Sequence, residues 1–229
     1  MTRCRWNVVL FLGLAGFAVP SWADVFVGLR DAFEDDTAQG WEVGLPSANV
    51  PVNIASGGPA GAGDNYLVVT SSGGGGPGGR LVVFNESQWA GDYIAAGVTG
   101  IGLDVNNLGS NSVSLGLYFE DSISGLPANA AFSKSSFVVP AGSGWMHIVL
   151  GAQPDDLSAK FGSVTAALSG ARRVRLYHGG TASFPGAPIV AQLGIDNVTA
   201  VPEPGTSSLL GAGMAVMLMG ALARRFRHP

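Results

Sequence analysis

Short runs in which apolar and polar residues alternate recur along most of this chain of 229 residues. Residues 113–119 alternate in this way, and residues 101–105 and 173–177 repeat the pattern. A period of two puts every second side chain on one face of a β-strand, so each run predicts a strand with one buried face. Residues 66–70 and 81–84 are more continuously apolar, which is typical of strands in the middle of a sheet.

Glycine-rich segments separate these runs. The chain contains 35 glycines, many of them in GGPAGAG (57–63) and GGGGPGG (73–79). Neither a Lys-Ser/Thr pair nor a helical pattern follows the second segment, so it indicates a flexible connection between strands and not a phosphate-binding loop. Only residues 156–168 hint at a helix. We therefore predict one all-β domain over residues 24–200, a β-sandwich or jelly roll of about eight short strands.

The N-terminus has the three parts of a secretory signal peptide. Basic residues come first, residues 7–19 are almost wholly apolar, and Ser21-Trp22-Ala23 provides a small-x-small cleavage sequence. We predict a signal peptide over residues 1–23 and an exported protein. Cys4 is the only cysteine, and removal of the signal leaves a chain without disulfides or thiolate metal sites.

A second apolar segment lies at the other end of the chain. Residues 206–223 carry no charge, and as a helix they would reach roughly 27 Å, close to the ~30 Å hydrocarbon core of a bilayer. Arg224 and Arg225 follow at once. Because positive charge beside a span stays in the cytoplasm, the sequence predicts a single C-terminal transmembrane helix with the domain outside.

The motif Pro202-Glu203-Pro204, the apolar segment and the terminal arginines together resemble the PEP-CTERM sorting tail of bacterial surface proteins, over residues 201–229. The resemblance implies a precursor held in the inner membrane, whose tail an exosortase recognises and removes. The partners implied are the export machinery and that exosortase. The mature domain would then lie at the cell surface or outside the cell, as part of the envelope or of the extracellular matrix of a biofilm.

The exported part of the chain is acidic. When the five arginines of the two end segments are set aside, seven basic residues face sixteen acidic ones, which gives a net charge of about −9. An acidic surface repels phosphate backbones, so we expect no nucleic-acid partner.

Three stretches of the domain, at 32–44, 84–119 and 192–201, resemble the galactose-binding-like jelly rolls of many carbohydrate-binding modules. In those modules, acids of the first strand and an Asp of the last strand hold a structural calcium ion. The resemblance therefore implies a Ca²⁺ site at Glu34, Asp36 and Asp196, since calcium prefers six to eight hard oxygen ligands. A solvated acidic turn, with Asp196 capping a strand end, is the alternative.

Aromatic and basic side chains suggest a site for polysaccharide. Tyr118, Arg175 and Tyr177 fall on outward positions of predicted strands, and Trp89 lies in a polar loop. Sugar rings stack on aromatic faces while charged groups bind their hydroxyls. The alternative is that Trp89 and the other aromatics close the edge of the core.

The sequence contains few of the residue patterns that indicate catalysis. His147 and His178 have no neighbouring Glu or His at metal-binding spacing, and no Gly-x-Ser-x-Gly segment occurs. The paired acids are adjacent in sequence and would point to opposite faces of a strand, whereas glycosidases need two carboxylates facing one bond. We predict a non-catalytic, carbohydrate-associating protein. A structural or adhesive protein acting through protein contacts is the alternative, and a polysaccharide hydrolase is the third reading.

Overall fold

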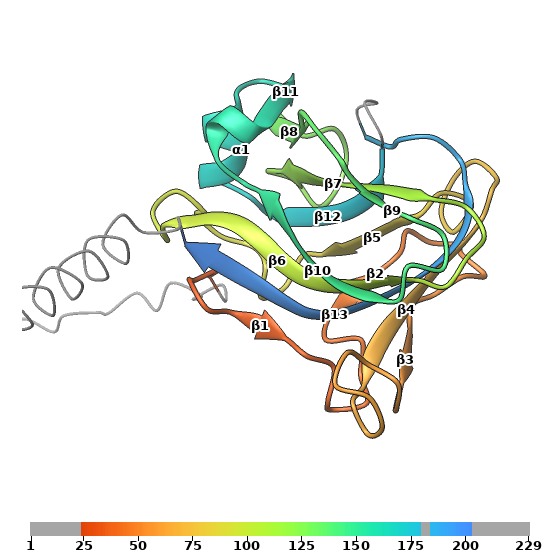
Figure 1. Cartoon of the computed structure of the whole chain (residues 1–229). Coiled ribbons are helices and arrows are strands. Elements are labelled where there is room, and N and C mark those ends of the chain that lie inside the picture. The colour runs from red at the N-terminus through yellow and green to blue at the C-terminus, as the bar shows by residue number, and fades with distance from the viewer. Residues whose placement is uncertain (1–23, 180–183, 203–229) are drawn as a thin grey trace, which may run out of the picture.

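The computed structural model describes residues 24–179 and 184–202, which form two antiparallel β-sheets packed face to face (Figure 1). The first sheet, here sheet A, has the strand order β10 (Trp145–Gly151), β6 (Val98–Asn107), β13 (Val190–Pro202), β4 (Tyr66–Ser72) and β3 (Val52–Ile54), with β1 (Arg30–Asp31) also paired to β13. The second, sheet B, has the order β11 (Leu157–Phe161), β8 (Ala130–Ser133), β7 (Val113–Glu120), β12 (Arg173–His178), β5 (Val82–Asn85) and β2 (Trp41–Glu42), with β9 (Phe137–Val139) also paired to β7.

The two sheets bury the apolar faces that the alternating runs predict. Leu103 and Val105 of β6 and Ile195 of β13 point inward from sheet A, and Leu115 and Leu117 of β7 meet them from sheet B. Each is at most 1 % exposed. Full burial of such a side chain contributes about 1.5–3 kcal/mol, so these facing rows are the main source of stability. The predicted all-β sandwich is confirmed.

The first and last strands of the described chain are neighbours in sheet A. Arg30 and Asp31 of β1 pair with Thr199 and Val198 of β13. Strand β13 also pairs with β6 and β4, so the last strand runs through the centre of the sheet. This arrangement brings the acidic segment after β1 close to Asp196, as the predicted calcium site requires.

The predicted helical stretch is divided in the structure. Residues 157–161 form β11, and Gly162 adopts a positive φ of 55° that ends the strand. Helix α1 (Val164–Ser169) begins only after Ser163, whose side chain accepts a hydrogen bond from the backbone N–H of Ala166. A 3₁₀ turn, η1 (Pro154–Asp156), precedes β11.

The two predicted end segments lie outside the described residues. The signal peptide (1–23) is not described, and neither is the tail beyond Pro202, which includes the predicted transmembrane segment 206–223. Within the described ranges, no helix is long and apolar enough to cross a membrane. The signal, the sorting motif and the transmembrane helix therefore stay predictions.

Candidate functional site

The outer face of sheet B, which points away from the core, collects three of the four predicted ligand-binding residues. Arg175 of β12 pairs with Tyr118 of β7 on one side and with Phe84 of β5 on the other. Tyr177 lies two residues further along β12 and therefore on the same face. The sequence prediction that Tyr118, Arg175 and Tyr177 share a surface is thus consistent with the strand register.

A network of charged groups fixes the arginines of this face. Oε1 of Glu120 accepts hydrogen bonds from Nη1 of Arg173, at 2.9 Å, and from both Nε and Nη2 of Arg175. Arg173 also donates from Nε to Oε2 of Glu86, at 2.8 Å. Charge-assisted bonds of this kind hold a guanidinium in one orientation. Burial lowers the pKa of Arg175, and the charge of Glu120 opposes that effect.

Phe184 covers the two tyrosines. Its ring centroid lies 4.5 Å from that of Tyr118 and 5.9 Å from that of Tyr177. Both tyrosines are only 2 % exposed, and burial raises the pKa of each phenol to about 12, with the charge of Glu120 adding to the effect at Tyr118. In this arrangement neither tyrosine presents an open ring face to a sugar, and Phe184 forms the accessible aromatic surface.

A pocket of about 300 Å³ opens beside Phe184 on the same face of sheet B. Its walls come from the segment after β2, the glycine-rich connection between β4 and β5, strands β5 and β12, and the chain that follows β12. The lining residues are Gly44, Gly76, Pro77, Gly78, Arg80, Val82, Arg175, Phe184 and Pro185. A pocket with mainly apolar walls and a few fixed polar groups is the usual form of a small-ligand site, and this volume is at the small end of the range.

The glycine-rich connection shapes this pocket. Gly78 has a φ of +69°, and a β-carbon there would collide with Oγ of Ser47. Arg80 follows directly, and its Nη1 donates a hydrogen bond to the carbonyl of Gly186. Sequence reasoning identified residues 73–79 as a connection but missed their place in a pocket, together with Arg80 and Phe184. Only their joint position next to β12 in space reveals the pocket.

Trp89 is not part of this surface, and the structure places it as the alternative interpretation of the sequence expected, packed against the core. Its side chain is 0 % exposed and belongs to the core between the sheets. The indole Nε1 of Trp89 donates to Oδ2 of Asp31 at 2.6 Å, and Nε1 of Trp41 donates to the same oxygen at 2.7 Å. Both rings can be buried without loss of a hydrogen bond, because Asp31 accepts from both indole N–H groups.

Asp196 occupies a buried position on the outer side of sheet A. Its side chain is 0 % exposed, and Oδ2 has no hydrogen-bond partner among the described residues. Burial, together with the nearby charges of Asp64, Asp104 and Glu34, raises the pKa of this carboxyl to about 7. An unpartnered buried carboxylate oxygen surrounded by other acids fits the chemistry of a hard divalent cation.

The predicted calcium ligands do not all join this group. Glu34 acts on Asp196 through its charge, but its Oε1 accepts a hydrogen bond from the backbone N–H of Asn65 at 3.3 Å. Oδ1 of Asp36 accepts from Nδ2 of Asn65 at 2.9 Å. No cluster of three or more His, Cys, Asp or Glu side chains in metal-binding geometry occurs in the described part of the chain. Asp64 was not predicted, because nothing in its local sequence indicates its approach to β13.

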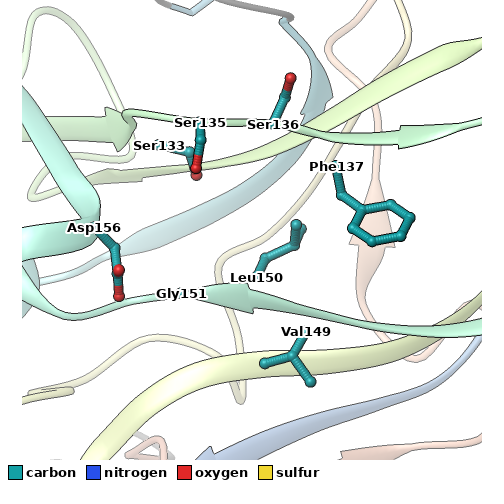
Figure 2. Close-up of a pocket in the computed structure, with 8 residues that line it drawn as sticks. All are labelled: Ser133, Ser135, Ser136, Phe137, Val149, Leu150, Gly151 and Asp156. Carbon is teal, nitrogen blue, oxygen red and sulfur yellow. The ribbon is translucent and has the colours of Figure 1, made fainter.

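A second hollow, of about 130 Å³, lies between the two sheets at one edge of the sandwich. Figure 2 shows three serines and Phe137 on one side, with β10 and Asp156 on the other. Oγ of Ser133 accepts a hydrogen bond from the backbone N–H of Leu117 at 2.8 Å, and Oδ2 of Asp156 accepts from that of Gln153 at 3.1 Å. Both groups are engaged in holding backbone, and the hollow lacks a histidine among its lining residues.

The two histidines of the domain lie on different sheets. Nδ1 of His147 lies 2.9 Å from Oδ1 of Asp104 on sheet A. Nδ1 of His178 on sheet B accepts a hydrogen bond from the backbone N–H of Ser114 at 2.9 Å, and burial lowers its pKa. Neither arrangement joins a base to a nucleophile. The absence of catalysis stays a prediction.

Comparisons with known proteins find solved structures of the same architecture. No protein-family model matches the chain, and no curated protein sequence matches it significantly. Among solved structures, the family 11 carbohydrate-binding module of Clostridium thermocellum, in complex with a β-1,3-1,4-mixed-linked tetrasaccharide, aligns with a TM-score of 0.51 and 13 % identity over 78 % of this chain and 98 % of that chain. The fold is the jelly roll of such modules.

Two further structures align over the same share of this chain. A solution structure of CtCBM11 gives a TM-score of 0.50 and 13 % identity, covering 98 % of that chain. An exo-β-agarase gives a TM-score of 0.55 and 14 % identity, but this chain spans only 26 % of that enzyme. At these identities the likeness concerns the fold alone.

Proposed function

We propose that this domain associates with extracellular polysaccharide, without catalysis, through the pocket on the outer face of sheet B. The observation that carries the proposal is the pocket itself, because it combines apolar walls from Val82, Phe184 and Pro185 with the donor groups of Arg80 and Arg175. Apolar surface accepts the C–H faces of a sugar, and guanidinium groups donate hydrogen bonds to its oxygens. The jelly-roll fold shared with a carbohydrate-binding module supports the same reading.

Affinity electrophoresis of the purified protein through gels containing different polysaccharides tests the proposal. The panel contains mixed-linked β-glucan, agarose, cellulose derivatives, pectins and polysaccharide from the host's own matrix. Retardation by at least one polymer, lost on Arg175→Met and kept on Arg30→Met, supports the proposal. Arg30 is the matched control because it is exposed and donates to Asn197 on sheet A. No retardation by any polymer, together with capture of host envelope proteins, would favour the adhesive alternative. Release of reducing sugar would favour a hydrolase.

We also propose that the protein is exported, held briefly by residues 206–223 and released by an exosortase that acts at Pro202-Glu203-Pro204. The charge pattern of the two end segments supports export and a C-terminal anchor with the domain outside. The resemblance of residues 201–229 to a PEP-CTERM sorting tail supports the cleavage step. The intact mass of the protein from the outer fraction of its host is the test. A mass that ends near the Pro-Glu-Pro motif supports processing, and a mass that retains Arg224 and Arg225 contradicts it.

A structural calcium ion at Asp196 is the third part of the proposal. The unpartnered Oδ2 of Asp196 and the neighbouring Glu34 and Asp64 support it. A bound cation would neutralise the repulsion among these carboxylates and tie the loops that precede β2 and β4 to sheet A. Its effect would be structural, because this group lies on the opposite sheet from the pocket.

A further inference from the structure

We propose that the pocket on sheet B selects an anionic saccharide, one that carries a carboxylate or a sulfate ester, over a neutral one. This inference rests on the proposed function and names the ligand class of that same site. Two guanidinium groups, those of Arg80 and Arg175, line the pocket, and the lining contains no carboxylate among the described residues. A pocket of this charge is unexpected on a domain whose exported part carries a net charge of about −9.

Arg80 supplies the positive charge that the protein does not itself neutralise. Its one side-chain hydrogen bond in the described structure goes to the neutral carbonyl of Gly186, and it forms no ion pair with a described residue. Arg173 and Arg175, by contrast, are matched by Glu86 and Glu120. A half-buried guanidinium without a counter-charge gains most from an anionic ligand, because the ligand replaces lost hydration with a charge-assisted bond.

Arg175 offers a second, pre-oriented group. Glu120 binds its Nε and Nη2, which leaves Nη1 without an acceptor among the described residues. The guanidinium lies 4.7 Å from the ring centroid of Phe184 and 5.1 Å from that of Phe84. Contact with two rings and one carboxylate fixes its plane, so little side-chain entropy remains to be lost when an anion binds.

The apolar walls distinguish a saccharide from a free inorganic anion. Pro77, Val82, Phe184 and Pro185 surround the two arginines. These groups add nothing to the binding of phosphate or sulfate ions, whereas they cover the C–H face of a sugar ring. Four of the sixteen acids, namely Glu34, Asp64, Asp104 and Asp196, lie close together beside sheet A and not at this pocket.

The test compares matched polymers by isothermal titration calorimetry of the full-length protein. Polygalacturonate against its methyl ester forms the carboxylate arm, and κ-carrageenan against agarose forms the sulfate arm. We expect at least tenfold tighter binding to the charged member of one pair, weakening as salt is added because screening reduces attraction between charges. The arm that responds identifies which anion is recognised.

Variants of Arg80 locate the effect. Arg80→Met should weaken binding of the charged polymer about tenfold or more. It should weaken binding of the neutral polymer by a smaller factor, because a neutral sugar loses a hydrogen bond but no attraction between opposite charges. Arg80→Lys should recover part of the loss for the charged polymer, and Arg30→Met should change nothing. Thermal melting checks that each variant is folded. Equal binding of charged and neutral polymers overturns the anionic preference but leaves the proposed function intact. Equal losses in Arg80→Met and Arg30→Met overturn the assignment to this pocket. Failure of every polymer, charged or neutral, overturns the proposed function as well.

Discussion

Asp31 is expected to be among the most costly single side chains to remove from this domain. It is 4 % exposed, and its Oδ2 accepts the indole N–H groups of Trp41 and Trp89. Asp31→Ala would leave both N–H groups buried without an acceptor, at about 1–3 kcal/mol each. Gln88 also donates to Asp31 but has a second acceptor in the carbonyl of Gln39. The expected loss is therefore about 2–6 kcal/mol, a large part of the 5–15 kcal/mol typical of a folded domain.

Urea unfolding followed by tryptophan fluorescence measures this loss directly. Trp89→Phe keeps an aromatic ring in the core but removes one charge-assisted hydrogen bond and part of the buried ring volume, so it should cost at least about 1.5–3 kcal/mol. Asp155→Ala is the control, because Asp155 is exposed and we expect a change within about 0.5 kcal/mol. A loss below about 1 kcal/mol for Asp31→Ala would refute the reasoning. Loss of polysaccharide binding by a fully stable Trp89→Phe variant would refute the placement of Trp89 in the core.

Three other changes test separate parts of the structure. Asp196→Asn should stabilise the calcium-free protein above pH 7 but not near pH 4. Burial raises the pKa of Asp196 from 3.8 in the unfolded chain to about 7 in the fold. The carboxyl therefore costs the fold nothing below pH 4, where it is protonated in both states. Between pH 4 and pH 7 the free energy of unfolding falls, by at most about 4 kcal/mol, because only the unfolded chain releases the proton freely. If calcium binds at Asp196, chelation should lower the melting temperature of the wild type but not that of Asp196→Asn. A melting temperature that changes neither on chelation nor on the substitution would contradict a calcium site at Asp196. Phe184→Ala should uncover Tyr118 and Tyr177 and lower their phenol pKa values from about 12 towards 10 in an ultraviolet titration, whereas unchanged values would mean that Phe184 does not shield them. Gly78→Ala should cost about 1–3 kcal/mol, because it places a β-carbon at a φ of +69° against Ser47. Gly125→Ala is the control for the backbone contribution, because Gly125 has a φ of +71° and open space around it. Equal losses of stability in the two variants would rule out a steric contribution from Ser47.

The strands of four or more residues with a clear apolar pattern could be predicted from the sequence, and the two-residue strands could not. Strands β6, β7 and β13 have eight to thirteen residues, enough for several periods of alternation. Strands β1 and β2 have two residues each, which cannot carry a period, and only their pairing to longer strands defines them.

The candidate site was predictable only in part, for a related reason. Tyr118, Arg175 and Tyr177 lie on regular strands, so their shared face follows from strand geometry. Phe184 lies in an irregular segment, and its cover over the tyrosines depends on tertiary contacts that no local pattern records. Trp89 lies in a polar segment, but the acceptor of its indole N–H, Asp31, is 58 residues away in sequence. The burial of the ring depends on this distant partner, so the local sequence alone could not predict it.

The central claim is that the pocket on sheet B binds saccharide. Its most direct test is an amide chemical-shift map of the isotope-labelled protein, titrated with oligosaccharides from a polymer that retards the protein in affinity electrophoresis. Binding through sheet B predicts shifts at Gly76 to Val82, at Arg175 and at Phe184, with sheet A residues around Asp196 unaffected. Shifts confined to sheet A, or none with any oligosaccharide of the panel, would contradict the account.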